Sequence, residues 1–147
     1  MDMMTLKPIG VVRNKVKQPI RHGWGEIVSE IVVNSDLTEA LDSLDEFSHL
    51  IVLYWMHQLP AGRQLPHKVH PMGKSELPLV GRFATRSPSR PNPVGQSTVK
   101  LLERKANVLK VKGLDAIDGT PVIDIKPYLP GYDSAADAKV PLWITNQ

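Results

Sequence analysis

Short runs of apolar, often β-branched residues alternate along the chain with polar connections that are rich in proline or glycine. Runs of this length and composition predict β-strands. The pattern predicts seven strands, over residues 6–13, 27–33, 49–56, 79–85, 95–102, 108–112 and 122–126. The run 49–56 is apolar at both odd and even positions, which predicts a central strand buried on both faces.

Helical periodicity is confined to one place. Residues 37–46 have leucines and an alanine on one face and acids on the other, which predicts a short helix. Residues 57–78 show no period, and the three prolines in residues 86–93 exclude a helix or a central strand there. Asp118 and Gly119 mark a turn before the last strand. The sequence therefore predicts a mainly β protein, a small closed or highly curved β-barrel of about seven strands with one short helix.

Length and composition exclude several classes of protein. The 147 residues predict a single domain over 1–147. The longest apolar run, residues 50–56, is far shorter than the ~20 residues of a membrane-spanning helix, and no signal core precedes it, so we expect a cytoplasmic protein with no membrane partner. The absence of cysteine excludes disulfides and thiolate chemistry. Glycine-loop nucleotide motifs are also missing.

The only spacing suggestive of metal binding is the pair His67 and His70. Both lie in a stretch predicted as a loop, and no third ligand follows at a suitable spacing. Because zinc sites use three or four protein ligands, no metal is expected.

Positive charge is concentrated in the middle of the chain. Residues 62–100 carry a net charge of +6 in a chain whose total is +3, and seven of the 13 prolines lie between Pro60 and Pro93. Such a patch favours an anionic partner, with nucleic acid first among the candidates. A solvated loop with scattered charges explains the composition equally well. The cations are Arg63, Lys68, Lys74, Arg82, Arg86, Arg90 and Lys100.

Three groups of residues are candidates for chemistry. His57 and Gln58 follow the most apolar strand, where they can orient a small ligand or simply cap the strand. Arg86 and Arg90 lie on a proline-stiffened loop, and their planar guanidinium groups match phosphate or carboxylate. The third group lies in the last predicted strand and just beyond it.

In that strand, strict alternation places Asp124 and Lys126 on one face together with Val122, and Ile123 and Ile125 on the other. The two charged residues form either a surface ion pair or the rim of a pocket. Beside such a pocket, Tyr128 would be a stacking platform.

Five segments resemble one family of proteins in the same order along the chain. They are residues 8–13, 44–50, 57–58, 81–95 with its Arg-Pro-Asn-Pro block, and 118–128 with its Asp-Ile-Lys-Pro-Tyr block. The chain resembles the TsaA-like, TrmO-type family of tRNA-modifying methyltransferases from about residue 5 to residue 130.

The resemblance implies a small β-barrel that binds S-adenosylmethionine (SAM) without a Rossmann domain, and a homodimer. It also implies methylation of N6 of threonylcarbamoyladenosine at position 37, beside the tRNA anticodon, with the anticodon stem-loop as partner. Gln96 departs from some relatives, which carry an apolar residue there. The Gly23–Trp24 loop falls near another family cofactor contact, at a different spacing. The positions that match family cofactor contacts are His57, Gln58, Arg86, Gln96, Gly113, Leu114 and Asp115.

The chemistry of this reaction suggests roles for further residues. Asp124 is the first candidate to accept the proton of the exocyclic amine. Lys126 or Arg90 would bind the threonyl carboxylate or a phosphate, and Tyr128 or Trp24 would stack the base. Two alternatives stay open: a non-catalytic RNA-binding barrel, and a SAM-dependent methyltransferase with another acceptor. The candidate RNA contacts are Arg63, Lys68, Lys74, Arg82, Arg90 and Asn92.

Overall fold

A computed structural model describes residues 2–20, 22–57 and 66–144 of the chain. Contacts divide the chain into two compact units. The barrel unit comprises residues 1–58 and 94–128, and the proline-rich unit comprises residues 59–93 and 129–147. No helix within the described ranges is long and apolar enough to cross a membrane.

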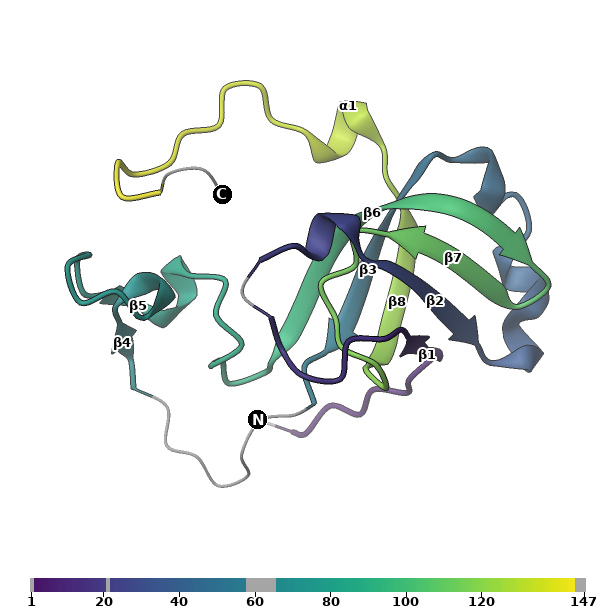
Figure 1. The fold of residues 1–147 in the computed structure, drawn as a ribbon, viewed down its shortest axis with the longest axis horizontal. Helices are drawn as coiled ribbons and strands as arrows, with labels where there is room; N and C mark the ends of the chain where they lie inside the picture. The colour runs from purple at the N-terminus through teal and green to yellow at the C-terminus, as the bar shows by residue number, and fades with distance from the viewer. Residues whose placement is uncertain (1, 21, 58–65, 145–147) are drawn as a thin grey trace. The chain divides into compact units, whose positions relative to one another are not determined.

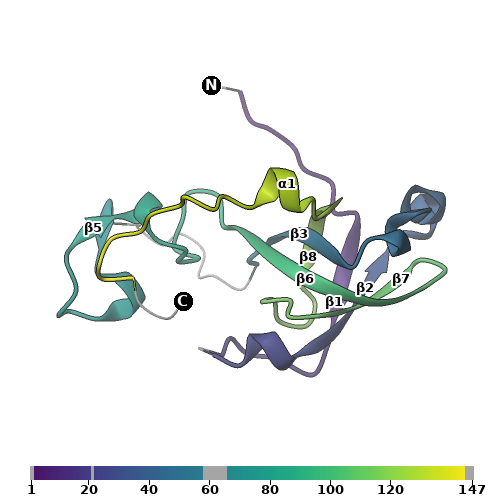
Figure 2. The same ribbon diagram turned by 90° about the horizontal axis from the view of Figure 1, so that it is seen from above.

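The barrel unit is built around a closed antiparallel β-barrel, which confirms the predicted fold class (Figure 1). Six strands form it in the order β1-β2-β7-β6-β3-β8. The view from above shows β3, β6 and β7 side by side (Figure 2). The strands are β1 (Gly10–Arg13), β2 (Val28–Val33), β3 (His49–Trp55), β6 (Val94–Lys105), β7 (Val108–Lys112) and β8 (Pro121–Pro127).

The barrel interior is filled by every second residue of each strand, as the period of a β-strand requires. Val12, Ile31, Val52 and Leu109 are fully buried there. The connection between β7 and β8 adds Leu114 and Ala116 to the same core, although residues 113–117 have no regular secondary structure. Residues 113–117 therefore pack into the core between the two strands.

The prediction that β3 is buried on both faces is wrong. Leu50, Val52 and Tyr54 point into the core, whereas Ile51 and Leu53 on the opposite face are only partly buried. A closed barrel has one interior, so the outward face of β3 stays apolar and half-exposed.

A bulge in β8 changes which residues share a face. Leu53 of β3 pairs with Asp124, but Tyr54 pairs with Val122, so Ile123 is an extra residue in β8. Val122 is fully buried, and Ile125 packs against the core. Asp124 and Lys126 do share the outward face, but the prediction that Val122 lies with them is wrong, because strict alternation takes no account of a bulge.

The predicted helix over residues 37–46 is replaced by two 3₁₀ helices, η2 (Ser35–Leu41) and η3 (Leu44–Glu46). They are separated at Ser43, whose φ of 72° interrupts any continuous helix. The apolar side chains Leu37, Leu41 and Leu44 still pack against the barrel core. The short α-helix α1 (Pro130–Asp133) forms instead where the sequence showed little pattern.

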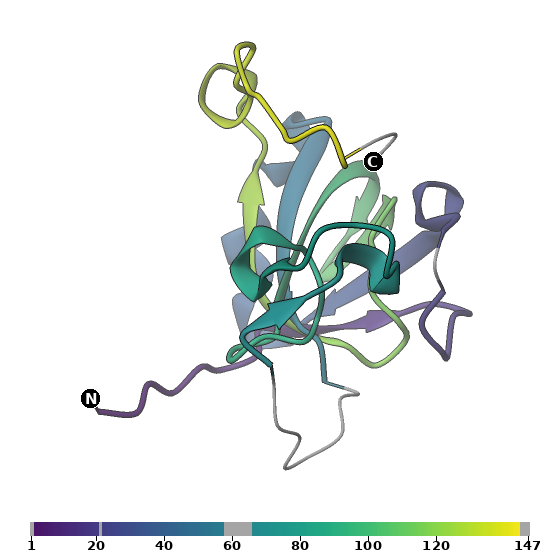
Figure 3. The ribbon, with the colours of Figure 1, turned by 90° about the vertical axis from the view of Figure 1, so that its left-hand side faces the viewer.

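The proline-rich unit contains a two-stranded sheet of β4 (Lys68–Val69) and β5 (Val80–Gly81), seen from the side in Figure 3. The strand predicted over residues 79–85 ends early, because the 3₁₀ helix η5 (Arg82–Ala84) begins directly after β5. The 3₁₀ helix η4 (Pro71–Gly73) lies between the two strands in sequence, within the stretch that had shown no period.

Gly95 provides a test of the barrel packing. A Cβ at this position would lie 2.2 Å from Cε2 of the Tyr54 ring, which is 3% exposed. We expect Gly95→Ala to lower the free energy of unfolding by about 1–3 kcal/mol, measured by denaturant titration. Gly25→Ala is the control, because nothing lies within 4 Å of its Cβ position. Equal stability of the two variants would contradict this packing.

Candidate active site

A row of side chains crosses the outward face of three neighbouring strands. Leu53 of β3 pairs with Gln96 of β6 on one side and with Asp124 of β8 on the other. Directly paired residues point to the same face of a sheet, and two strand spacings separate Gln96 from Asp124 by about 10 Å. A candidate cofactor residue and the candidate proton acceptor therefore flank one half-exposed apolar side chain.

The next outward row contains Lys126, which pairs with Ile51. Its Nζ lies 3.1 Å from Oδ2 of Asp124, and the side chains are 59% and 45% exposed. Oδ1 of Asp124 accepts the N–H of Ile125 at 2.9 Å. An exposed ion pair of this kind adds little to stability, so its charges are free to act on a ligand.

Tyr128 lies just beyond β8. Its N–H donates to the carbonyl of His49 at 3.0 Å, and its ring meets the His49 ring edge-on, with centroids 6.3 Å apart. These two contacts fix the direction of the tyrosine side chain.

Most of the other cofactor candidates gather at one end of the barrel. In an antiparallel barrel, the end of β3, the start of β6 and the end of β7 lie at the same rim. His57 follows β3, and its Nε2 is 3.9 Å from the Cβ position of Gly119. Residues 113–115 follow β7, and Gln96 is near the start of β6. Gln58 lies outside the described residues.

Residues 113–115 are tied to this rim by hydrogen bonds. The N–H of Gly113 donates to the carbonyl of Ile27 at 3.0 Å. The N–H of Asp115 donates to Oγ of the buried Ser97 at 3.2 Å, and Ser97 also contacts the Tyr54 hydroxyl at 3.1 Å. The side chain of Leu114 is fully buried in the core, so Leu114 would contact a ligand through its backbone.

Gly23 and Trp24 lie at the same rim. Gly23 has a φ of 93° and precedes the 3₁₀ helix η1 (Trp24–Glu26). The indole N–H of Trp24 donates to the carbonyl of Ile20 at 3.1 Å. The carbonyl oxygen of Gly25 is 3.9 Å from the Cβ position of Gly113, which places η1 beside residues 113–115.

In the proline-rich unit, Arg86 and Arg90 differ in their surroundings. Nη1 of Arg90 donates to the carbonyls of Thr85 at 2.7 Å and Ser87 at 3.1 Å, and its guanidinium lies 5.8 Å from the centre of the Phe83 ring. Arg86 stands between Thr85 and Ser87 in the sequence, and its side chain is exposed. Arg90 therefore braces the loop that presents Arg86.

Arg82 is arranged differently from the RNA contact that the sequence predicted. Its side chain is buried at 7% exposure, and its guanidinium donates to the carbonyl of Pro66 through Nε and Nη2. This arrangement gives Arg82 a role in holding the unit together. Among the other RNA candidates, Lys68, Lys74 and Asn92 are exposed, and Arg63 lies outside the described residues.

Within the described ranges, no three histidine or acidic side chains gather as a metal site. The ring of His70 donates through Nδ1 to the carbonyl of Leu77 at 2.9 Å. That bond orients the imidazole within the loop.

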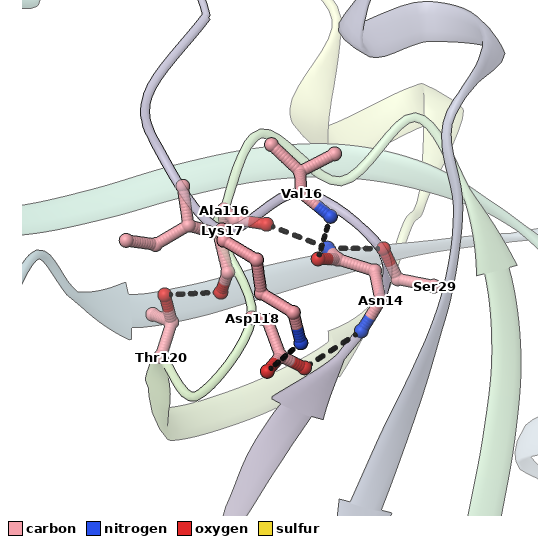
Figure 4. Close-up of polar contacts among 8 residues, drawn as sticks. Asn14, Val16, Lys17, Ser29, Ala116, Asp118 and Thr120 are labelled. Atoms are coloured by element: carbon pink, nitrogen blue, oxygen red, sulfur yellow. Dashed lines mark hydrogen bonds and ion pairs between the residues drawn. The ribbon is translucent and has the colours of Figure 1, made fainter.

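A polar network beside the barrel rim was not predicted from the sequence (Figure 4). Asp118 accepts the N–H of Asn14 at 3.0 Å and the ammonium of Lys17 at 2.7 Å. These two hydrogen bonds, the one from Lys17 first, hold the pKa of the Asp118 carboxyl below its ordinary value. The sequence signalled only a turn at Asp118 and Gly119, because the partners are about a hundred residues away.

The fold and the rim define a small antiparallel β-barrel with a partly apolar, polar-edged site. A family model for the tRNA-methyltransferase O N-terminal domain matches residues 11–134. This chain belongs to that family, which confirms the family predicted from the five sequence segments.

Individual proteins that this chain is similar to agree with this assignment. An S-adenosyl-L-methionine-binding protein of Archaeoglobus fulgidus is 44% identical over 88% of this chain and 93% of its own length. The tRNA (adenine(37)-N6)-methyltransferase of Escherichia coli is 38% identical over 94% of this chain and 63% of its own. A crystal structure of TrmO from P. aeruginosa superposes with a TM-score of 0.77 at 31% identity, covering 97% of this chain and 62% of that one.

The chain thus spans less than two thirds of the length of several relatives that it matches, and 38% of the length of one archaeal relative.

Asp118 gives the network a defined pH dependence. Because its pKa is lowered in the folded state, ionised Asp118 stabilises the fold at neutral pH, and this contribution disappears as the pH falls below about 4. We expect Asp118→Asn to be less stable than the wild type at pH 7, with the difference shrinking between pH 4 and pH 2 in denaturant titrations. Lys17→Ala, which removes the largest cause of the shift, should change stability in the same direction. A pH-independent difference would contradict this linkage.

Proposed function

We propose that this chain binds SAM and transfers its methyl group to N6 of an adenosine in tRNA, with threonylcarbamoyladenosine at position 37 as the acceptor. The observation that carries the proposal is the outward row of Gln96, Leu53 and Asp124 beside the rim that holds His57 and residues 113–115. The names of the SAM-binding and tRNA-methylating relatives support the same reaction.

The residues at the rim fit the chemistry of SAM. The cofactor combines an adenine ring and ribose hydroxyls with a carboxylate and two cationic centres. Gln96 offers an amide for hydrogen bonds, Leu53 offers a half-exposed apolar surface, and Asp115 is an exposed acid. Arg86 belongs to the proline-rich unit, where it is an exposed cation suited to a carboxylate; its cofactor role is the one that the family resemblance implies.

Asp124 is the proposed proton acceptor. When bound, SAM supplies a methyl group whose C–S bond breaks, with the electron pair staying on sulfur, as the N–C bond forms. Asp124 accepts a hydrogen bond from the exocyclic amine, which keeps the nitrogen lone pair directed at the methyl carbon, and then takes the proton. Lys126, whose Nζ lies 3.1 Å from Oδ2 of Asp124, holds that carboxylate in place. Alignment of the two substrates supplies much of the remaining acceleration.

The proline-rich unit is the proposed tRNA contact. Lys68, Lys74 and Asn92 are exposed, and Phe83, beside Arg90, is 76% exposed. Cations bind phosphates, and single-stranded loops are the parts of RNA whose bases proteins read. The anticodon stem-loop as the region bound, a homodimer and a cytoplasmic location stay predictions.

Asp124→Asn tests the chemical step. We expect kcat to fall about 100-fold or more with SAM and modified tRNA, because the amide cannot accept the proton, whereas the Kd for SAM changes little. Glu103→Gln is the matched control, since Glu103 forms a comparable exposed ion pair with Lys105 at 3.5 Å. A kcat within twofold of the wild type would remove Asp124 from the mechanism. Failure of the wild type to bind SAM in calorimetry would favour the non-catalytic RNA-binding alternative.

Lys68 and Lys74 test the RNA contact. Replacing both by alanine should raise the KM for tRNA and reduce the salt dependence of tRNA binding by about two phosphate contacts. The Kd for SAM should not change. A double replacement of Lys105 and Lys110, two exposed cations of the barrel, removes the same charge as a control. Equal losses in the two double variants would argue against a localised RNA surface.

A further inference from the structure

Residues 113–118 carry three of the proposed cofactor contacts but have no helix or strand to fix their backbone. A segment that forms no helix or sheet hydrogen bonds is positioned by hydrogen bonds to other parts of the chain. Two such bonds lead from residues 113–118 to one residue that the mechanism does not use, Asn14: one to its side chain and one to its backbone N–H.

Asn14 follows β1 and makes four hydrogen bonds at once (Figure 4). Its Nδ2 donates to the carbonyl of Ala116 at 2.8 Å and to Oγ of Ser29 at 2.9 Å. Its Oδ1 accepts the N–H of Val16 at 2.9 Å, and its own N–H donates to Asp118 at 3.0 Å. Three separate parts of the chain therefore meet on one asparagine.

The partners fix which way the amide points. The Val16 N–H can only donate, and the Ala116 carbonyl can only accept, so Oδ1 and Nδ2 are distinguishable here. Ser29 is 1% exposed in β2, which anchors the Asn14 side chain to the barrel wall. Asn14 thus connects the barrel wall directly to residues 116–118.

Backbone hydrogen bonds also hold the end of this segment, at Asp118 and Gly119. The N–H of Asp118 donates to the carbonyl of Val16 at 2.7 Å, and the N–H of Gly119 donates to the carbonyl of Val12 at 2.8 Å. The N–H of Gly113 is bonded to Ile27, that of Asp115 to Ser97, and the carbonyl of Ala116 to Asn14, so the cofactor candidates 113–115 are held at both ends of their segment.

We propose that Asn14 is a positioning residue for the cofactor site: it holds residues 113–118 in the arrangement in which Gly113, Leu114 and Asp115 bind SAM. The inference rests on the proposed function and adds a residue that does not itself need to touch the cofactor. A segment held in its binding conformation before the ligand arrives loses less entropy on binding, which raises affinity.

The test is Asn14→Ala in the full-length chain. We expect the Kd for SAM, measured by calorimetry, to rise about tenfold, the size of one lost hydrogen bond in the support of the site. The KM for tRNA should stay within twofold. In hydrogen exchange without ligand, the amides of residues 113–118 should exchange faster than in the wild type.

Asn107→Ala separates positioning from stability alone. Nδ2 of Asn107 donates to the carbonyl of Val33 at 2.6 Å beside the β6–β7 turn, at the opposite end of the barrel. This variant should lose stability but keep the SAM affinity and the slow exchange of residues 113–118. Asn14→Asp keeps an acceptor for Val16 but cannot donate to Ala116, so it should weaken SAM binding at least as much as Asn14→Ala.

The outcomes separate this inference from the proposed function. Wild-type binding of SAM together with unchanged affinity in Asn14→Ala and Asn14→Asp overturns the positioning role. An equal rise in the Kd for SAM in Asn107→Ala overturns the positioning role as well, because the loss of affinity would then follow from lower stability alone. Failure of the wild type to bind SAM overturns the proposed function, and the cofactor role of Asn14 with it, even if exchange shows that Asn14 holds the segment.

Discussion

Closure of the sheet by β8 is the constraint on which the site depends. β8 pairs with β3 along one edge and with β1 along the other, so no strand of the barrel has a free edge. Because every neighbour is antiparallel, segments distant in sequence reach the same rim: residues 14–17, 23–27, 57, 94–97 and 113–120. Asn14, which follows β1, reaches Ala116 and Asp118, which precede β8, because β1 pairs with β8.

The sequence predicted the barrel because short apolar runs with glycine and proline between them are a local property. The β7 strand was predicted residue for residue, and β2 and β3 to within one residue of each end. Predictions failed where geometry depends on a neighbour: Ile123 becomes a bulge only against β3, and Ser43 takes a positive φ that splits a helix with good periodicity. The strand over residues 79–85 ended early for a similar reason, at Arg82.

Chemically identical residues also proved different in the structure. Arg82, Arg86 and Arg90 occur at intervals of four, and composition makes them one cationic group. Arg82 is buried against a carbonyl, Arg90 braces its own loop, and Arg86 is exposed. The family resemblance supplied most of the candidate site residues, but it did not reveal Asn14, Ser97 or Asp118, because hydrogen bonds between residues 18 to 104 positions apart leave no pattern in sequence spacing.

The bulge at Ile123 decides which side chains of β8 face the barrel interior. If β8 kept all its residues but paired with strict alternation, Val122 and Asp124 would share one face. Either Asp124 and Lys126 would then turn into the apolar interior, where burying charge is expensive, or Val122 would leave it. The charged pair lies outside the closed barrel while Val122 lies inside because Ile123 is left unpaired against β3. The pairing of each residue, as much as its type, is therefore under constraint in this strand.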